Sequence, residues 1–246
     1  MKKLFTILFA VVCAGNLFAA DVVTDFSAAN KLYAEGKFSD AAKAYETILQ
    51  TGAQSPALWF NAGNAEFKSG QLGKAIAAYQ QAVQLSPRDA ELRANLAFVR
   101  NQVQGATLRE SRWQNGVNSL TLDEGTVLTV VFIWLLFGLL AVQQLRPALV
   151  PKLRSLTRLV AVVVIFAGTV LALQAANHFN SAIAVVTSGE ASARSGPFDE
   201  AQTVFTARDG AELRVLDRHD GWVQVVNATG KIGWLNRKQA EVLSGA

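Results

Sequence analysis

The sequence predicts a multidomain chain in which an all-α region of stacked helical hairpins is followed by a transmembrane helical hairpin and a small all-β barrel. Three observations lead to this fold class. A segment near the start repeats after 34 residues, so that Gly36 recurs as Gly70 and Tyr45 as Tyr79. Two long apolar stretches without a charge occupy the middle of the chain. Short alternating runs separated by glycine-containing turns make up the end, which is the pattern of a small barrel.

Residues 1–20 are expected to be an export signal. Lys2 and Lys3 precede an apolar run over residues 4–12, and small residues suitable for cleavage end the segment. The alternatives are an uncleaved anchor and a lipoprotein signal acylated at Cys13. That cysteine is the only one in the chain, so cleavage would leave a mature protein without thiols, which suits an oxidising compartment.

Two consecutive segments, residues 22–55 and 56–89, resemble tetratricopeptide repeats, whose period is 34 residues. The second segment carries the family's signature residues: Trp59, Ala62, Gly63, Phe67, Gly70, Ala75, Tyr79, Ala82 and Pro87. Residues 90–104 are expected to form a capping helix, so the repeat region spans residues 22–104. Tyr45 and Tyr79, which are 34 positions apart, are expected in the core between repeats.

The usual work of such an array is to hold another protein. By resemblance, the asparagines of the family's peptide-binding groove fall at Asn30, Asn61, Asn64 and Asn95. An asparagine amide both donates and accepts, so it can pair with the backbone of an extended peptide. The alternative is that these side chains are merely solvated.

After a linker at residues 105–124, the stretches 125–145 and 159–177 are each long enough to cross a lipid bilayer as a helix. The loop between them, residues 146–158, has no acidic residue and is therefore expected on the cytoplasmic side. Its positive charges are Arg146, Lys152, Arg154 and Arg158. The export signal independently places the repeat region outside, and the hairpin returns the C-terminal region to the same side. Neither span contains a charged residue, which argues against an ion path.

Alternating runs near the end of the chain are expected to be strands, at residues 203–205, 212–216, 222–226 and 231–235, with turns at Asp209-Gly210, Asp220-Gly221 and Ala228-Thr229-Gly230. With these motifs, residues 183–245 resemble a bacterial SH3-like (SH3b) domain. Such domains bind peptides or cell-wall material. Trp222 and Trp234 are candidates for an aromatic contact surface, and the alternative is that both rings fill the barrel core.

The order of export signal, repeats, membrane hairpin and SH3-like tail is similar to a member of the Bacteroides aerotolerance (Bat) family. That resemblance implies a multi-pass protein of the bacterial inner membrane with both end domains in the periplasm. It also implies von Willebrand factor A-type membrane proteins, other Bat proteins and a MoxR-type AAA+ ATPase as partners, and a role in envelope stress or oxygen tolerance. The competing hypothesis is an anchor that binds peptidoglycan and recruits a cell-wall enzyme.

Catalytic chemistry is not expected. The two histidines, His178 and His219, stand without cysteines that would complete a metal site, and no phosphate-binding glycine loop is present. The positive charges do not form a nucleic-acid footprint, although the formal net charge is +4. The sequence therefore predicts a scaffold without catalytic residues, cofactor, metal or nucleic-acid partner.

Overall fold

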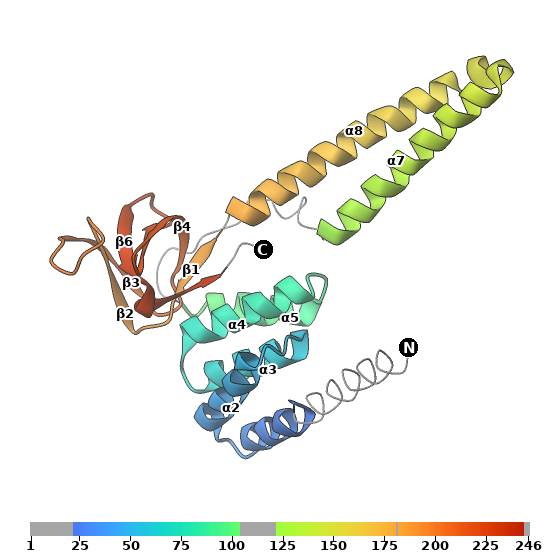
Figure 1. The fold of residues 1–246 in the computed structure, drawn as a ribbon. Coiled ribbons are helices and arrows are strands. Elements are labelled where there is room, and N and C mark those ends of the chain that lie inside the picture. The colour runs from blue at the N-terminus through green and yellow to red at the C-terminus, as the bar shows by residue number, and fades with distance from the viewer. Residues whose placement is uncertain (1–21, 104–121, 181, 244–246) are drawn as a thin grey trace, which may run out of the picture. The chain divides into compact units, whose positions relative to one another are not determined.

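A computed structural model describes residues 22–103, 122–180 and 182–243 (Figure 1). The expected export signal and most of the expected linker lie outside these residues. The chain divides into two compact units. One unit combines the N-terminal helices with the C-terminal strands, and the other contains the two long apolar helices. The second unit is thus an insertion within the sequence of the first.

Helical hairpins form the first part of the chain, as predicted. The helices are residues 22–34, α2 (Phe38–Gln50), α3 (Pro56–Lys68), α4 (Leu72–Leu85) and α5 (Ala90–Arg100). Helix α3 begins where the Ser55 hydroxyl accepts a hydrogen bond from the Leu58 amide, with Pro56 in the first turn. The tight turns inside each hairpin need a positive φ, which Gly36 and Gly70 supply at 76° and 85°.

Two tyrosines fill the space between neighbouring helices of the repeats. Tyr45 and Tyr79 are 1% and 2% exposed, which confirms them as core residues. Gly63 makes room for the second ring, because a Cβ at this position would lie 3.0 Å from carbon atoms of Tyr79. The 34-residue spacing of the tyrosines therefore reflects one packing arrangement used twice.

The inserted unit consists of α7 (Leu122–Leu145), the short helix η1 (Pro147–Leu149) and α8 (Val150–Asn180), with the two long helices side by side (Figure 1). Stretches of 22 and 30 residues, with a mean hydropathy of 2.5, are long and apolar enough to cross a membrane. Apolar side chains are exposed around both helices, and Gln143 donates a hydrogen bond to Thr157 between them. Helix α8 starts inside the expected loop and contains the whole of the expected second span.

Seven antiparallel strands form the C-terminal part of the chain. They are β1 (Ile183–Val186), β2 (Glu190–Arg194), β3 (Thr203–Arg208), β4 (Glu212–His219), β5 (Trp222–Val226), β6 (Ile232–Asn236) and β7 (Ala240–Leu243). Their order in the sheet is β3-β2-β6-β5-β4-β1-β7. The four strands expected from alternation are β3 to β6. Asp220 and Gly221 both have positive φ, as a tight hairpin turn between β4 and β5 requires.

The repeat helices and the strands share one hydrophobic core. Its buried members are Ala75, Ile76, Ala77, Tyr79, Leu96 and Val99 from the helices, with Val185 and Leu243 from the strands. Val103 and Ile183, which flank the inserted unit in sequence, both pack against this cluster. Two repeats are fewer than the three usually needed for a stable stack. The strands β1 and β7 cover the apolar surface that a third repeat would otherwise cover.

A close approach of backbones brings these strands against α4. A Cβ on Gly73 would overlap the carbonyl oxygen of Val186, so only glycine fits at this contact. The amide of Gly73 donates a hydrogen bond of 3.1 Å to Asp209 Oδ1 at the start of the turn before β4. This carboxylate thus pairs with a free amide at the N-terminal end of α4, where negative charge is favoured.

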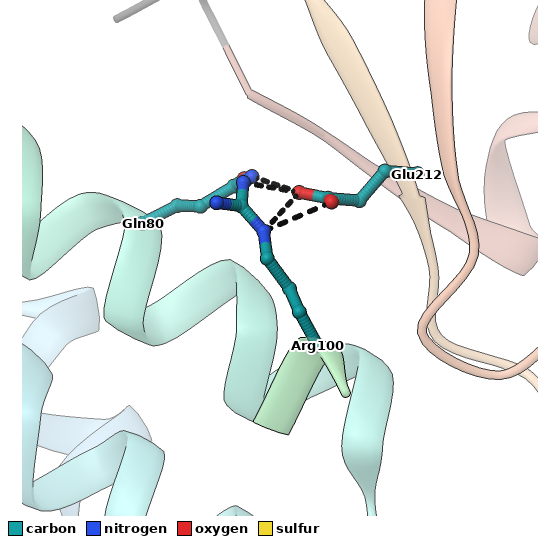
Figure 2. Close-up of polar contacts among 3 residues, drawn as sticks. All are labelled: Gln80, Arg100 and Glu212. Atoms are coloured by element: carbon teal, nitrogen blue, oxygen red, sulfur yellow. Dashed lines mark hydrogen bonds and ion pairs between the residues drawn. The ribbon is translucent and has the colours of Figure 1, made fainter. Parts of the chain in front are cut away.

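The same junction contains a buried ion pair (Figure 2). The side chain of Glu212 is 2% exposed and that of Arg100 is 31% exposed. Arg100 Nε and Nη2 donate to Glu212 Oε2 and Oε1 at 3.0 and 2.7 Å. The amide of Gln80 also donates to Oε1. Both carboxylate oxygens are thereby satisfied by the repeat helices, as a buried charge requires.

Replacing Arg100 with methionine leaves the Glu212 carboxylate buried without its cation. We expect Arg100→Met to lower the free energy of unfolding by about 3 kcal/mol. We also expect faster amide hydrogen exchange in α5 and in β1 and β7 together, measured by mass spectrometry on the full chain in detergent. Arg93→Met, at an exposed position of the same helix, is the control. Unchanged exchange in β1 and β7 would show that the ion pair does not hold the two regions together.

Candidate functional site

Three of the four asparagines expected to bind a peptide make hydrogen bonds within the repeat region. The hydroxyl of Tyr45 donates a hydrogen bond of 2.6 Å to Asn30 Oδ1, and Asn61 Nδ2 donates to the same oxygen at 3.0 Å. The hydroxyl of Tyr79 donates to Asn64 Oδ1 at 2.6 Å. The structure therefore brings Asn30 and Asn61 into contact and repeats the same tyrosine–asparagine bond one hairpin later.

The fourth asparagine, Asn95, lies on α5 apart from this network. Its Nδ2 donates to the backbone carbonyl of Glu91, one turn earlier in the same helix. The side chain is half-buried, and its Oδ1 is not used in that bond. Asn95 therefore offers a partner one acceptor, whereas it shares no hydrogen bond with the other three.

The hydrogen bonds described above leave some polar atoms of these asparagines without a partner among the described residues. Within the described residues, the Nδ2 groups of Asn30 and Asn64 and the Oδ1 of Asn61 make no hydrogen bond. All three side chains are half-buried. Two donors and one acceptor at fixed positions match the carbonyls and amides of an extended peptide, and their orientation is set before binding.

Burial affects the acid–base properties of both hydroxyl donors. It raises the pKa of Tyr45 and that of Tyr79 above the ordinary value for a phenol. Ionising either phenol would bring a charge into the core and would remove the proton that the asparagine oxygen accepts. The neutral, donating form of each tyrosine is consequently the one that orients Asn30 and Asn64.

The two candidate tryptophans of the strand region lie on the same face of β5 and β6. Val223 and Leu235 are fully buried, so alternation directs Trp222 and Trp234 to the other face. Trp222 is nevertheless only 8% exposed, whereas Trp234 is half-buried. The exposed ring of His219 lies edge-on to Trp234, with 6.4 Å between the ring centroids. Trp234 is thus the tryptophan that a ligand can reach more readily.

A cavity of about 320 Å³ lies where the repeats meet the strands, and sequence reasoning missed it. Helices α2, α3 and α4 and strand β7 line it, and its residues include Glu46, Trp59, Glu66, Lys74 and Glu241. The carboxylates come from both ends of the chain. Only the Trp59 and Glu66 spacing, which puts both on one face of a helix, gave a local signal, and that signal is common in packed repeats.

Comparison with protein families supports both domain types. Residues 63–102 match the family model described as TPR repeat, and residues 187–241 match the one described as Bacterial SH3 domain. No curated protein matches the chain. The predicted fold class is thereby confirmed: a helical tetratricopeptide (TPR) region, two long apolar helices and an antiparallel SH3b domain.

Removing the hydroxyl of Tyr79 tests its bond to Asn64. We expect Tyr79→Phe to lower the free energy of unfolding by about 1 kcal/mol at neutral pH, because a part-buried acceptor loses its donor. The raised pKa of Tyr79 adds stability that is complete below about pH 10, the ordinary phenol value, and is lost as the pH rises further.

Circular dichroism and tyrosinate absorbance, followed together against pH, measure both effects. Wild-type protein should lose helicity as Tyr79 ionises, and Tyr79→Phe should show a weaker dependence on pH in that range. The matched control is Tyr33→Phe, whose ring packs edge-on against Phe38. Equal stability and an equal alkaline transition in wild type and Tyr79→Phe would contradict the assigned role.

Proposed function

We propose that this chain is an inner-membrane scaffold whose TPR and SH3b domains both lie in the periplasm and bind partner proteins. The observation that carries the proposal is the core that the two domains share although α7 and α8 separate them in sequence. We assign the chain a binding role and no catalytic role.

The shared core supports a hairpin topology. A single hydrophobic cluster that includes Ile76 and Val185 cannot be divided across a bilayer, so both domains must face the same side of any membrane that the chain enters. An even number of spans between them satisfies this condition, and α7 and α8 supply two. The cationic loop between the helices favours the cytoplasm for the tip of the hairpin. The proposal therefore assigns both domains to the opposite, periplasmic side.

Fusion reporters test the topology in cells. A reporter that is active only in the periplasm should be active when it follows Gly196 and inactive when it follows Pro151. Both positions lie outside the shared core, and each reporter is inserted into the full-length chain so that Val185 and Leu243 of that core stay present. Activity at Pro151 together with inactivity at Gly196 would invert the orientation, and equal behaviour of the two fusions would refute the hairpin.

The asparagine groups of the groove support protein binding. Their free donors and acceptor can pair with the backbone of an extended segment without selecting its side chains. By resemblance to a BatE-like member of the Bat family, we infer that the partners are von Willebrand factor A-type membrane proteins, other Bat proteins and a MoxR-type AAA+ ATPase. The process would then be envelope stress or oxygen tolerance.

The SH3b match supports a second function, in which the chain anchors itself to peptidoglycan and recruits a cell-wall enzyme. The reachable face of Trp234 beside His219 gives this alternative a site, because aromatic rings stack on sugar and peptide groups. The two functions give the SH3b domain different ligands, a protein in the first and peptidoglycan in the second. Binding of the full chain to peptidoglycan through Trp234 therefore distinguishes them.

Substitution of Asn64 with aspartate tests the groove. The carboxylate keeps an acceptor for the Tyr79 hydroxyl but removes the Nδ2 donor, so the core bond survives while the outward group is lost. We expect Asn64→Asp to reduce partner recovery about tenfold in pull-downs from detergent extract, with bound proteins identified by mass spectrometry.

Asn101→Asp, at an exposed position after α5, makes the same chemical change away from the groove and should recover partners normally. The purified full chain is also mixed with cell-wall sacculi. Co-sedimentation that Trp234→Ala abolishes, combined with normal recovery by Asn64→Asp, would replace the scaffold by the wall anchor. Equal partner recovery by all variants would remove the groove from the mechanism.

A further inference from the structure

The cavity at the junction has a different character from the asparagine groove. At 3.6 residues per turn, Trp59 and Glu66 lie on the face of α3 opposite Asn61 and Asn64. The cavity is lined by α2, α3 and α4, and Glu241 of β7 lies at its border with the strands. A partner held by the groove asparagines would leave this cavity open.

Glu66 gives the cavity a hydrogen-bond acceptor that the described residues leave unsatisfied. It is 8% exposed and lines the cavity, and its Oε2 makes no hydrogen bond with any residue that the structure describes. Burial raises the pKa of this carboxyl, and the nearby carboxylates of Glu46, Glu241 and Asp209 add to that effect. A buried carboxylate without a donor is unfavourable, so a cationic donor in the cavity would stabilise its ionised form.

The charges that surround Glu66 favour a cation as the ligand. Glu46 on α2 and Glu241 on β7 line the same cavity, and Lys74 on α4 is the positive group there that opposes them. No group of three carboxylate, imidazole or thiol side chains among residues 22–103, 122–180 and 182–243 is placed to hold a metal ion. An extended organic cation can reach carboxylates that are too far apart to share a metal.

Trp59 and Leu49 line the cavity with apolar surface. This surface suits a planar cation carried on an alkyl chain. Trp59 Nε1 donates a hydrogen bond of 2.6 Å to Gln54 Oε1, which fixes the indole. A guanidinium group stacks on an indole face and donates in parallel to carboxylate oxygens, and its weak hydration lowers the cost of entering a partly buried site. Leu49 can pack against the methylene stem.

We propose that the cavity lined by Trp59 and Glu66 binds an arginine side chain of a partner protein. This inference rests on the proposed scaffold function and names one chemical feature of the partner. The groove would hold the backbone of one partner segment, and the cavity would select a basic side chain on the other face of α3. Selection by side-chain charge is what the asparagine groups alone cannot provide.

The probe is acetyl-Gly-Arg-Gly-amide, titrated by calorimetry into the purified full chain in detergent micelles. The matched peptide with citrulline in place of arginine has nearly the same shape and no charge. We expect the arginine peptide to bind and the citrulline peptide not to bind. Glu66→Gln, which keeps the size of the side chain, should weaken binding about tenfold, whereas Glu200→Gln, at an exposed glutamate outside the cavity, should change nothing.

A thermal unfolding curve for Glu66→Gln guards against loss of the fold, and the substitution should not lower the unfolding temperature because it removes a buried unpaired charge. Equal binding of both peptides, undiminished binding to Glu66→Gln, or binding of spermidine without binding of the arginine peptide would overturn the proposal. If the arginine peptide fails to bind while Asn64→Asp still abolishes partner recovery, the cavity is refuted and the scaffold function stands.

Discussion

The carboxylate of Glu212 is the group on which the organisation of this chain depends. It lies in a strand of the SH3b domain, is removed from water, and has its hydrogen-bond donors, Arg100 and Gln80, in the TPR region. Burial of this charge is tolerated because Arg100 and Gln80 supply its hydrogen bonds when the two regions are docked. The ion pair therefore acts beside the shared apolar cluster and favours the docked arrangement in which Glu212 meets Arg100. The two domain types behave here as parts of one folded unit.

The candidate peptide-binding asparagines are also coupled to the core. The oxygens of Asn30 and Asn64 accept hydrogen bonds from buried tyrosines, so the orientation of these side chains depends on the packing of Tyr45 and Tyr79. On the opposite face of α3, the repeat helices line a cavity, and β7 contributes Glu241 to its lining. One helix thus contributes to two surfaces of different chemistry, one neutral and hydrogen-bonding and the other acidic and aromatic.

Much of the fold followed from local patterns in the sequence. The 34-residue period located the hairpins and their buried tyrosines, charge-free length located α7 and α8, and alternation located β3 to β6. Strands β1, β2 and β7 were covered only by the overall resemblance, because β1 is apolar throughout, the buried residues of β2 are only alanines, and β7 is four residues long with burial at its two ends. The candidate site was predicted less completely. The asparagine positions were visible, but the bonds that orient them depend on tertiary packing.

The contacts between the repeat helices and the strands could not be predicted from the sequence. Glu212 looked like an ordinary polar residue of an alternating strand, and Gly73 like a residue of a repeat turn. Their partners are 132 and 136 positions away, a separation over which neither periodicity nor spacing carries information.

The inserted hairpin has a consequence for biosynthesis. Ribosomes complete Ile76 and Val99 long before they reach Val185, so the nascent repeats wait with an uncovered apolar end while the two long helices are made. Closure of the core joins segments far apart in the chain and is therefore a late, slow step. The N-terminal domain can therefore complete its folding only after the C-terminal strands have been synthesised.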